Sequence, residues 1–491
     1  MHPARVSGGL ILTIDIGTSS VRTLVYDETP SALSAYTARR SVDVQVDSTG
    51  RAELDARALC AAVSACIDET LGLLGSRAAQ IIAVAAATMA TTMVAVDAQG
   101  RPVGPLRTYA DTRSDAAAQQ LRSRHDERIV HARTGCMLRP NYWPARIAWL
   151  AQAHPIEWAQ TRALWTLGAY LAAEYTGTAC VTHSEAAWTG LLDRVALTWD
   201  RVWLADLGWN DAALPALHDV ETALPPLVAA YAARWPVLAQ VPWYGAIGDG
   251  AAANLGSGCV GADVMALTVG TTGALRIAVP GTPLPPTGLW SYRVDRQLAL
   301  VGGATSEGGN VYQWLRDTLR FDGDDAALAA AVAALAPDAH GLTMLPLFAG
   351  ERSPGWAGDA RATIHGLHLG TTAVDLVRAG YEAIALRFGQ IAASLPATAR
   401  VVASGGALEH AAVWLQICAD VLGRPVETTA VSEATSRGVA MLALQSLGVR
   451  RLADTPAPPT VQTYHPDAAA HRVYRAAAQR QQRLYRAVVT L

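Results

Sequence analysis

Ile14-Asp15-Ile16-Gly17-Thr18-Ser19-Ser20-Val21-Arg22 has a pattern that occurs a second time in the chain. The second copy is Leu267-Thr268-Val269-Gly270-Thr271-Thr272-Gly273-Ala274-Leu275-Arg276, and this repeat determines the fold that we expect. Each copy has the residues of a strand, then a tight turn of glycine and hydroxyl residues, then a second strand. Two such turns, facing each other across a cleft, would direct backbone N–H groups and hydroxyls at a polyphosphate. The repeated stretch therefore predicts two related halves that bind ATP by its phosphates.

The chain contains no lysine, so its 39 basic residues are all arginine. A P-loop ends in Gly-Lys-Ser or Gly-Lys-Thr, and a protein kinase needs a strand lysine, so both of these ATP-site designs are excluded. Turns, a metal ion and arginine must then hold the nucleotide.

The length of 491 residues exceeds the roughly 250–300 residues at which one hydrophobic core stops growing, so two domains are expected, 1–244 and 245–491. The net charge of −3 suggests no nucleic-acid or membrane-surface partner. Six scattered cysteines without Cys-x-x-Cys spacing indicate neither a zinc site nor a disulfide framework. We find no signal-peptide pattern and no spanning-length apolar stretch free of charges and turn residues, so we expect a cytoplasmic protein.

Strands that alternate with helices predict an α/β fold in both halves. A buried strand is expected at 81–85, and helices are expected at 326–335 and 377–391. The strand expected at 400–404 runs into Gly405-Gly406-Ala407, where paired glycines would let a base or a ribose approach the backbone. Gly256–Gly261 fits Gly-x-Gly-x-x-Gly, but the expected helix before it and strand after it reverse the context of a dinucleotide site.

One carboxylate lies between two glycines, in Gly248-Asp249-Gly250, directly before a helix of small residues. The glycines permit close approach of a ligand. A carboxylate at a helix N-terminus is often only a cap. The second phosphate turn follows soon in the sequence, however, so this residue is expected beside the γ-phosphate.

The motifs occur in an order that resembles the FGGY carbohydrate kinases over nearly the whole chain. The order is Asp15-x-Gly17-Thr18-x-Ser20-x-Arg22, then Gly248-Asp249-Gly250, Gly270-Thr271-Thr272, and Ser404-Gly405-Gly406-Ala407. Tyr109-Ala110-Asp111-Thr112-Arg113 resembles the family's aromatic-x-Asp-x-Arg sugar-site segment, and Gly350-Glu351-Arg352-Ser353-Pro354 agrees as well. Within the family the chain is most similar to the gluconokinase-like branch, which is related to xylulokinases, through Thr134-Gly135-Cys136 and Tyr142-Trp143-Pro144-Ala145-Arg146.

The resemblance implies two actin-like (ribonuclease H-like) domains with ATP, Mg²⁺ and substrate in the cleft between them. Asp249 would be the catalytic base, and Asp15 would hold the metal. The implied phosphate- and nucleotide-binding residues are Gly17, Thr18, Ser19, Ser20, Gly270, Thr271, Thr272, Gly309, Gly405, Gly406 and Ala407. The implied substrate-binding residues are Tyr109, Asp111, Arg113 and Asp249.

A sugar acid suits this arrangement, because a guanidinium such as that of Arg113 can grip a carboxylate in bidentate fashion, with Arg139 as a second contact. The expected reaction is therefore conversion of D-gluconate to 6-phosphogluconate. Xylulose, or another pentulose or polyol, is the alternative substrate. An actin-fold ATPase switch without sugar transfer is the alternative of a different class. A small sugar or sugar acid is the expected partner, and a homodimer is plausible for the family.

Overall fold

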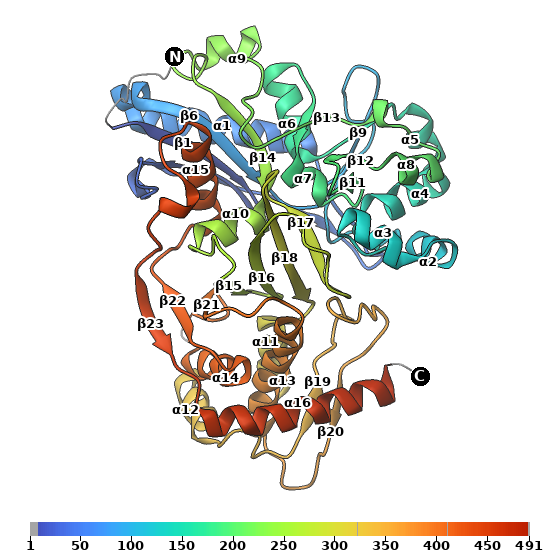
Figure 1. Ribbon diagram of the computed structural model, residues 1–491, viewed down its shortest axis with the longest axis vertical. Coiled ribbons are helices and arrows are strands. Elements are labelled where there is room, and N and C mark those ends of the chain that lie inside the picture. The colour runs from blue at the N-terminus through green and yellow to red at the C-terminus, as the bar shows by residue number, and fades with distance from the viewer. Residues whose placement is uncertain (1–7, 322, 410, 490–491) are drawn as a thin grey trace.

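Two lobes form the molecule, one around each of two large sheets (Figure 1), and the computed structural model describes residues 8–321, 323–409 and 411–489. The first sheet has the order β14-β6-β1-β2-β3. Its strands are β1 (Leu10–Ile16), β2 (Ser20–Tyr26), β3 (Ala38–Ser41), β6 (Ile81–Thr88) and β14 (Trp243–Gly248). β2 is antiparallel to β1 and β3, whereas β1, β6 and β14 run parallel.

The second sheet has the order β17-β18-β16-β15-β21-β22-β23. Its strands are β15 (Val264–Val269), β16 (Gly273–Pro280), β17 (Trp290–Arg293), β18 (Leu298–Thr305), β21 (Arg400–Ser404), β22 (Val426–Thr429) and β23 (Thr460–Tyr464). The run β18-β16-β15-β21-β22 repeats the order and the directions of β3-β2-β1-β6-β14. The repeat of one topology confirms the expected pair of actin-like α/β domains.

Long helices cover these sheets. α1 (Ala56–Leu74) and α6 (Leu167–Thr176) belong to the first lobe, and α13 (Ala373–Ala393), α14 (Ala412–Leu422) and α16 (Ala468–Val488) to the second. The expected helix at 377–391 and the expected strands at 81–85 and 400–404 are confirmed by α13, β6 and β21.

The other helices are α2 (Asp115–Arg124), α3 (Glu127–Thr134), α4 (Trp143–Ala153), α5 (Pro155–Gln160), α7 (His183–Ala187), α8 (Arg201–Asp206), α9 (Ala229–Arg234), α11 (Gly309–Thr318) and α12 (Asp325–Ala334). Short strands complete the fold: β4 (Gln45–Val46), β5 (Ala52–Leu54), β7 (Val94–Val96), β8 (Leu106–Arg107), β9 (Ala163–Trp165), β10 (Cys180–Thr182), β11 (Leu192–Asp193), β12 (Thr198–Trp199), β13 (Ala216–His218), β19 (Thr343–Leu345) and β20 (Thr363–His365). α12 confirms the helix expected at 326–335.

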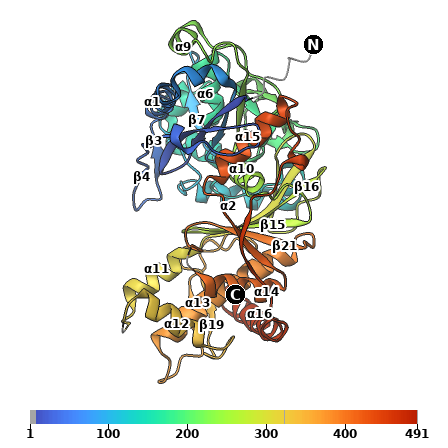
Figure 2. The ribbon, with the colours of Figure 1, turned by 90° about the vertical axis from the view of Figure 1, so that its left-hand side faces the viewer.

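Two helices join the lobes. α10 (Asp249–Gly256) follows β14, and α15 (Ala434–Ser446) follows β22, so they take equivalent places in the two repeats. They pack against each other, and α15 lies beside β1 and β6 of the first sheet although it comes late in the chain (Figures 1 and 2). A Cβ at Gly256 would lie 1.8 Å from the Ala434 carbonyl oxygen, and one at Gly438 would lie 1.9 Å from that of Ala252. Glycine at both positions therefore permits backbone contact between these helices.

The boundary expected between residues 244 and 245 falls inside β14, a strand of the first sheet. The segment Gly256–Gly261 begins at the last residue of the helix α10 and precedes the strand β15. A dinucleotide site needs the opposite order, a strand before the glycines and a helix after them, so this segment is a turn.

In the described part of the chain, one helical stretch, Ala56–Gln80, is long and apolar enough by length and composition to cross a membrane. It contains Arg57, Asp68 and Glu69. Its residues Val63 and Ile67 are fully buried in the core of the first lobe. The stretch is thus built as a core helix, packed on the first sheet.

Candidate active site

The two phosphate turns occupy the same place in the two repeats, between the first and second strands. The turn after β1 is closed by a hydrogen bond from the Gly17 N–H to the Ser20 carbonyl oxygen, at 3.0 Å. In the turn after β15, the Gly270 N–H donates to the Thr272 carbonyl oxygen at 2.9 Å. The turn that the sequence repeats thus occurs as the same kind of hydrogen-bonded turn in both lobes.

Three glycine-rich segments meet at the second turn. The Gly309 N–H donates to the Gly270 carbonyl oxygen at 2.8 Å, and the Ala407 N–H donates to the Val269 carbonyl oxygen at 3.1 Å. Gly405 has φ of +103°, and a Cβ there would lie 2.4 Å from the Val269 oxygen. Gly406 beside it is exposed. The structure therefore brings Gly270, Gly309 and Gly405–Ala407 together as a surface built mainly of backbone.

A cavity of about 240 Å³ lies close to this surface and is lined by both halves of the chain. Thr91, Tyr109 and Trp188 come from the first half, and Asp249 follows directly after β14 of the first sheet. Thr272 of the second phosphate turn, Arg276, Tyr292 and Arg352 come from the second half. The volume lies just below the 300–1,000 Å³ typical of drug-sized ligands, so the cavity suits a small molecule.

Asp249 is the first residue of α10 and lines this cavity. Burial raises the pKa of its carboxyl group, while the Gly250 N–H, the charge of Arg276 and the Ala90 N–H lower it, and the net direction is upward. Gly248 is the N-cap residue, and the carboxylate accepts a hydrogen bond from the N–H of the adjacent Gly250, at 2.7 Å. Asp249 is therefore a cavity residue and not the helix cap.

The glycines beside Asp249 have a structural reason that the sequence did not reveal. A Cβ at Gly248 would lie 2.6 Å from Nε1 of Trp188, and one at Gly250 would lie 3.0 Å from Cη2 of the same ring. The two glycines thus make room for the Trp188 indole, which stacks on Tyr292 with ring centroids 4.1 Å apart. The interpretation that they serve ligand approach is revised accordingly.

Asp15 is the last residue but one of β1, where its side chain is almost fully buried. One of its oxygens accepts a hydrogen bond from Arg22 at 2.7 Å, and Arg22 also pairs with Glu433 at 2.7 Å. Burial raises the pKa of Asp15 to about 6; the charge of Arg22 opposes this rise, and the charge of Asp249 adds to it. Asp15 and Asp249 are therefore close enough for their negative charges to interact.

The remaining residues of the first turn, Gly17, Thr18, Ser19 and Ser20, do not line the cavity. Ser20 is buried at the start of β2, whereas Ser19 is exposed. In this region of the chain, Asp15 is the residue whose charge interacts with that of Asp249.

The predicted substrate segment is divided by the structure. Tyr109, which is 43% exposed, lines the cavity, but Asp111 and Arg113 do not. Arg113 pairs with Asp111 and Glu53, and its guanidinium lies 4.8 Å from the ring centroid of Trp149. Asp111 and Arg113 are thus held within the protein. Their predicted contact with substrate is not supported by this arrangement.

Arg139, predicted as a second carboxylate contact, also has a partner in the protein. Its guanidinium pairs with Glu127 at 2.5 Å and lies 5.3 Å from the ring centroid of Trp356. It does not line the cavity.

Two arginines of the cavity were missed as site residues. Arg276 lies on β16, two residues beyond Ala274 and therefore on the same face of the strand. Its Nη1 donates to Thr268 Oγ1 at 3.2 Å, and its Nε has no partner among the described residues. Arg352 forms no ion pair with any described residue. Arg352 lies in a motif that carried the family resemblance, and Arg276 ends the second copy of the repeated stretch, but nothing in the sequence marks either arginine as unpaired.

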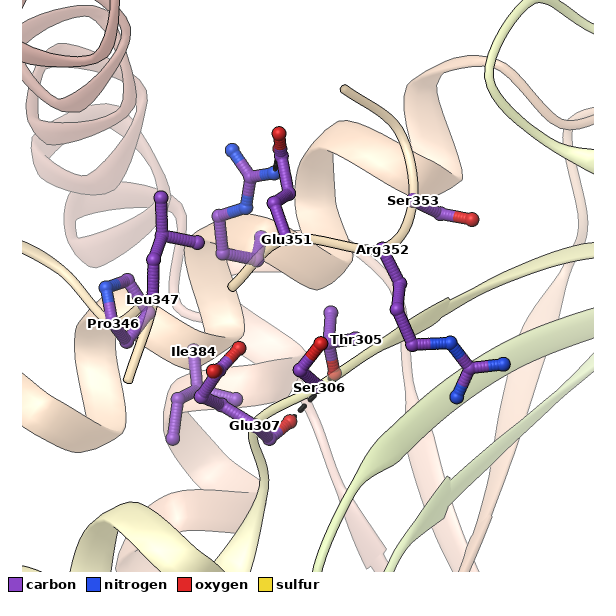
Figure 3. Close-up of a pocket in the computed structure, with 10 residues that line it drawn as sticks. Thr305, Ser306, Glu307, Pro346, Leu347, Glu351, Arg352, Ser353 and Ile384 are labelled. Atoms are coloured by element: carbon purple, nitrogen blue, oxygen red, sulfur yellow. Dashed lines mark hydrogen bonds and ion pairs between the residues drawn. The ribbon is translucent and has the colours of Figure 1, made fainter. Parts of the chain in front are cut away.

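Figure 3 shows the surroundings of Arg352, where its side chain extends away from those of Glu307 and Glu351. Glu351 pairs instead with Arg387 and accepts a hydrogen bond from the Tyr485 hydroxyl. Burial raises the pKa of Glu307 to about 7, and its Oε1 accepts a hydrogen bond from the Ala349 N–H at 2.9 Å. Both nearby acids thus have other partners, and the guanidinium of Arg352 is directed to the larger cavity.

Comparison with known proteins agrees with this architecture. A model of the FGGY family of carbohydrate kinases, N-terminal domain, matches residues 10–256, and the C-terminal domain model matches residues 265–447. The chain is 31% identical over 473 residues to a glycerol kinase of Polaromonas sp. (strain JS666), covering 90% of this chain and 92% of that protein. It is 25% identical over 373 residues to a gluconokinase of Bacillus licheniformis, covering 73% and 72%. The crystal structure of gluconate kinase from Lactobacillus acidophilus superposes with a TM-score of 0.92 at 22% identity, covering 98% of this chain and 99% of that one, which shows a common fold.

Proposed function

We propose that this chain, which belongs to the FGGY family of carbohydrate kinases, transfers the γ-phosphate of ATP to the primary hydroxyl of D-gluconate. The product would be 6-phosphogluconate. The observation that carries this proposal is the cavity itself, in which Asp249 and Thr272 of the second phosphate turn line one space of small-molecule size. An acceptor hydroxyl beside Asp249 would thus lie near a phosphate held by that turn.

Asp249 acts as the general base in the proposed reaction. The hydroxyl oxygen forms a bond to the γ-phosphorus while the bond from that phosphorus to the β,γ-bridging oxygen breaks, and ADP leaves. The hydroxyl proton passes to the Asp249 carboxylate. A positioned base contributes about 10²–10⁴-fold to such a rate. The upward direction of the Asp249 pKa favours this role, because a more basic carboxylate accepts the proton more readily.

The nucleotide occupies the backbone surface at the second turn in this proposal. Gly270, Thr271 and Thr272 donate to phosphate oxygens, and Gly309, Gly405, Gly406 and Ala407 line the adenosine site. The hydrogen bonds that join these segments support the assignment. Gly17, Thr18, Ser19 and Ser20 are assigned to the phosphates from the other lobe, in a closed state of the cleft.

Asp15 is proposed to help hold Mg²⁺, and its surroundings fit a cation. Its carboxylate is buried, its pKa is raised by the charge of Asp249, and one oxygen is already engaged by Arg22. The carboxylate would hold the ion directly or through a water molecule. When bound, the ion supplies positive charge at the phosphates. Asp15 would hold that positive charge beside the first phosphate turn.

The second candidate is a kinase for xylulose or another pentulose or polyol. The similarity to a glycerol kinase favours it, as the similarity to a gluconokinase favours the acid. An actin-fold ATPase without sugar transfer has no such support. We also keep as proposals the two functional regions 1–244 and 245–491, a homodimer, and a cytoplasmic location.

ADP release with Mg-ATP tests the proposal across D-gluconate, D-xylulose, D-ribulose, glycerol and erythritol, with a control that lacks an acceptor. Turnover that depends on D-gluconate is the expected result. Turnover on a ketose or polyol alone would keep the mechanism and replace the substrate. ATP hydrolysis that no acceptor stimulates would contradict the kinase reaction.

A further inference from the structure

We infer that Arg276 and Arg352 form an anion subsite within the acceptor cavity, so that the acceptor is a polyol bearing a carboxylate. The inference rests on the proposed function and specifies its substrate class. It replaces Arg113, which is paired inside the protein, with two arginines that line the cavity.

The first observation is that both guanidiniums lack a counter-ion. Among the described residues, neither Arg276 nor Arg352 forms an ion pair with a carboxylate. The one hydrogen bond from the Arg276 guanidinium goes to a neutral hydroxyl, that of Thr268. A cation removed from water without an ion-pair partner is costly, and the single carboxylate that lines the cavity, that of Asp249, leaves the two guanidiniums one negative charge short. A bound anion would supply that charge.

The second observation concerns the charges that face the cavity. Its charged side chains are Asp249, Arg276 and Arg352, which leaves one positive charge in excess. Burial lowers the pKa of Arg276, and the like charge of Arg352 lowers it further, while Asp249 opposes the change. The two arginines therefore repel each other across the cavity. One carboxylate placed between them would neutralise the excess and remove that repulsion.

The third observation is a set of buried polar atoms without protein partners. Thr91 Oγ1, Trp188 Nε1 and Arg276 Nε are all buried and unpartnered, and all three residues line this cavity. Buried polar atoms are normally hydrogen-bonded, so three exceptions around one space indicate a polar ligand. Hydroxyls of a polyol fit the first two atoms, and a carboxylate oxygen fits the third.

An anion in this place has two sources, the acceptor and the γ-phosphoryl group of ATP. Arg276 lies four residues along β16 from Thr272, which is ~13 Å at the rise of a strand. That separation places the Cα of Arg276 beyond the phosphate turn, along β16. Its side chain nevertheless reaches back to Thr268, so the experiment must separate the two sources.

D-gluconate and D-glucitol are the matched pair for this purpose, because they differ only in a carboxylate against a hydroxymethyl group. We expect kcat/KM of the protein to be about 10²-fold higher for D-gluconate, as charge-assisted hydrogen bonds to one arginine pair allow. Arg276→Gln should abolish most of this preference, because kcat/KM should fall far more for D-gluconate than for D-glucitol, while the KM for ATP stays nearly unchanged. Calorimetry without nucleotide should show the same loss of D-gluconate binding.

Arg201→Gln is the matched control, since Arg201 pairs with Asp211 on the surface and should change neither acceptor. An equal fall of kcat/KM for both acceptors in Arg276→Gln, with a higher KM for ATP, would assign the arginine to the phosphoryl group and overturn the inference. If Arg276→Gln does not fold, two other measurements test the inference. They are the kinetics of Arg352→Gln and the preference of the unmodified protein for D-gluconate over D-glucitol. Equal use of both acceptors would overturn the inference alone, whereas phosphorylation of no carbohydrate would overturn the proposed function.

Discussion

The carboxyl group of Asp15 is 3% exposed beside Arg22, and burial raises its pKa to about 6 from the usual 3.8. The folded protein therefore binds this proton more tightly than the unfolded chain does. Stability from this group is present at low pH and is lost as the pH rises from about 4 to about 6. The loss amounts to ~3 kcal/mol at neutral pH. Asp15 is thus a residue whose charge costs stability until a cation or substrate offsets it.

Asp15→Asn should consequently unfold at a higher temperature than the unmodified protein at pH 7.5, with little difference at pH 4. The reason is that the amide carries no charge to bury, and Arg22 retains its bond to Glu433. Differential scanning calorimetry at the two pH values measures this, and the variant should also lose Mg-ATP-dependent turnover. A variant destabilised equally at both pH values would show that the Arg22 pair outweighs the burial of the charge.

The acid limb of the pH–rate profile should report the ionisation of Asp249. Because burial raises its pKa, kcat/KM should fall at a milder acidity than the usual value of 3.8 would give. Arg276→Gln removes a positive charge that lowers this pKa, so it should move the limb to higher pH. The profile is best measured with a neutral acceptor that does not need the arginine. An unmoved limb would mean that the two groups do not interact.

Short motifs in the sequence singled out Asp249 and Tyr109, and both line the cavity, while their catalytic and substrate-binding roles stay predictions. The sequence could not identify Arg276 or Arg352 among 39 arginines, since pairing depends on which acids the fold brings near. Arg113 was predicted to contact the substrate, but its charge is satisfied by Asp111 two residues away and by Glu53 sixty residues away. Local spacing was thus a poor guide to which charges stay free.

Among the elements, the contact between α10 and α15 has the most direct consequence for the site. α10 begins with Asp249, and a Cβ at Gly438 of α15 would meet the Ala252 carbonyl oxygen of α10. Because that oxygen belongs to the backbone, α10 would have to move. The base would move with it.

Gly438→Ala should therefore reduce both stability, by about 1–3 kcal/mol, and kcat. Gly72→Ala in α1 is the control, since nothing lies within 4 Å of a Cβ there and alanine favours a helix. Urea unfolding and steady-state kinetics of both variants give the comparison. Equal behaviour of the two variants would show that the helices separate without strain.

Most of the elements compared above were predictable, because α12, α13 and β21 carry their own periodic or apolar signals in the sequence. The crossing of α15 onto the first sheet was not predictable, since its contacts join residues about 350–430 positions apart. No local pattern specifies which sheet an apolar helix will cover.

The whole molecule consists of two repeats of one topology, and α15 of the second repeat packs on the first sheet. The core of the first lobe contains Val439 and Leu444 of α15 beside Ala83 and Ala87 of β6. A fragment that ends before α15 would therefore expose part of this core. The two halves depend on each other although each has its own sheet.

Residues 1–262 expressed alone should consequently bind the dye ANS and lack a cooperative thermal transition. Appending residues 430–449 through a flexible linker should restore cooperativity, because it returns α15 to β1 and β6. Calorimetry and ANS fluorescence of the two fragments test this. A fragment 1–262 that unfolds cooperatively near the Tm of the full chain would mean that α15 is dispensable for the first lobe.

In the proposed reaction, Asp249 removes the hydroxyl proton as the phosphoryl group is transferred. The most direct test is kcat with D-gluconate and Mg-ATP for the unmodified protein and for Asp249→Asn, which keeps the shape of the side chain. We expect a fall of about 10²–10⁴-fold in kcat with the KM for ATP nearly unchanged. A kcat that the substitution leaves intact would contradict it.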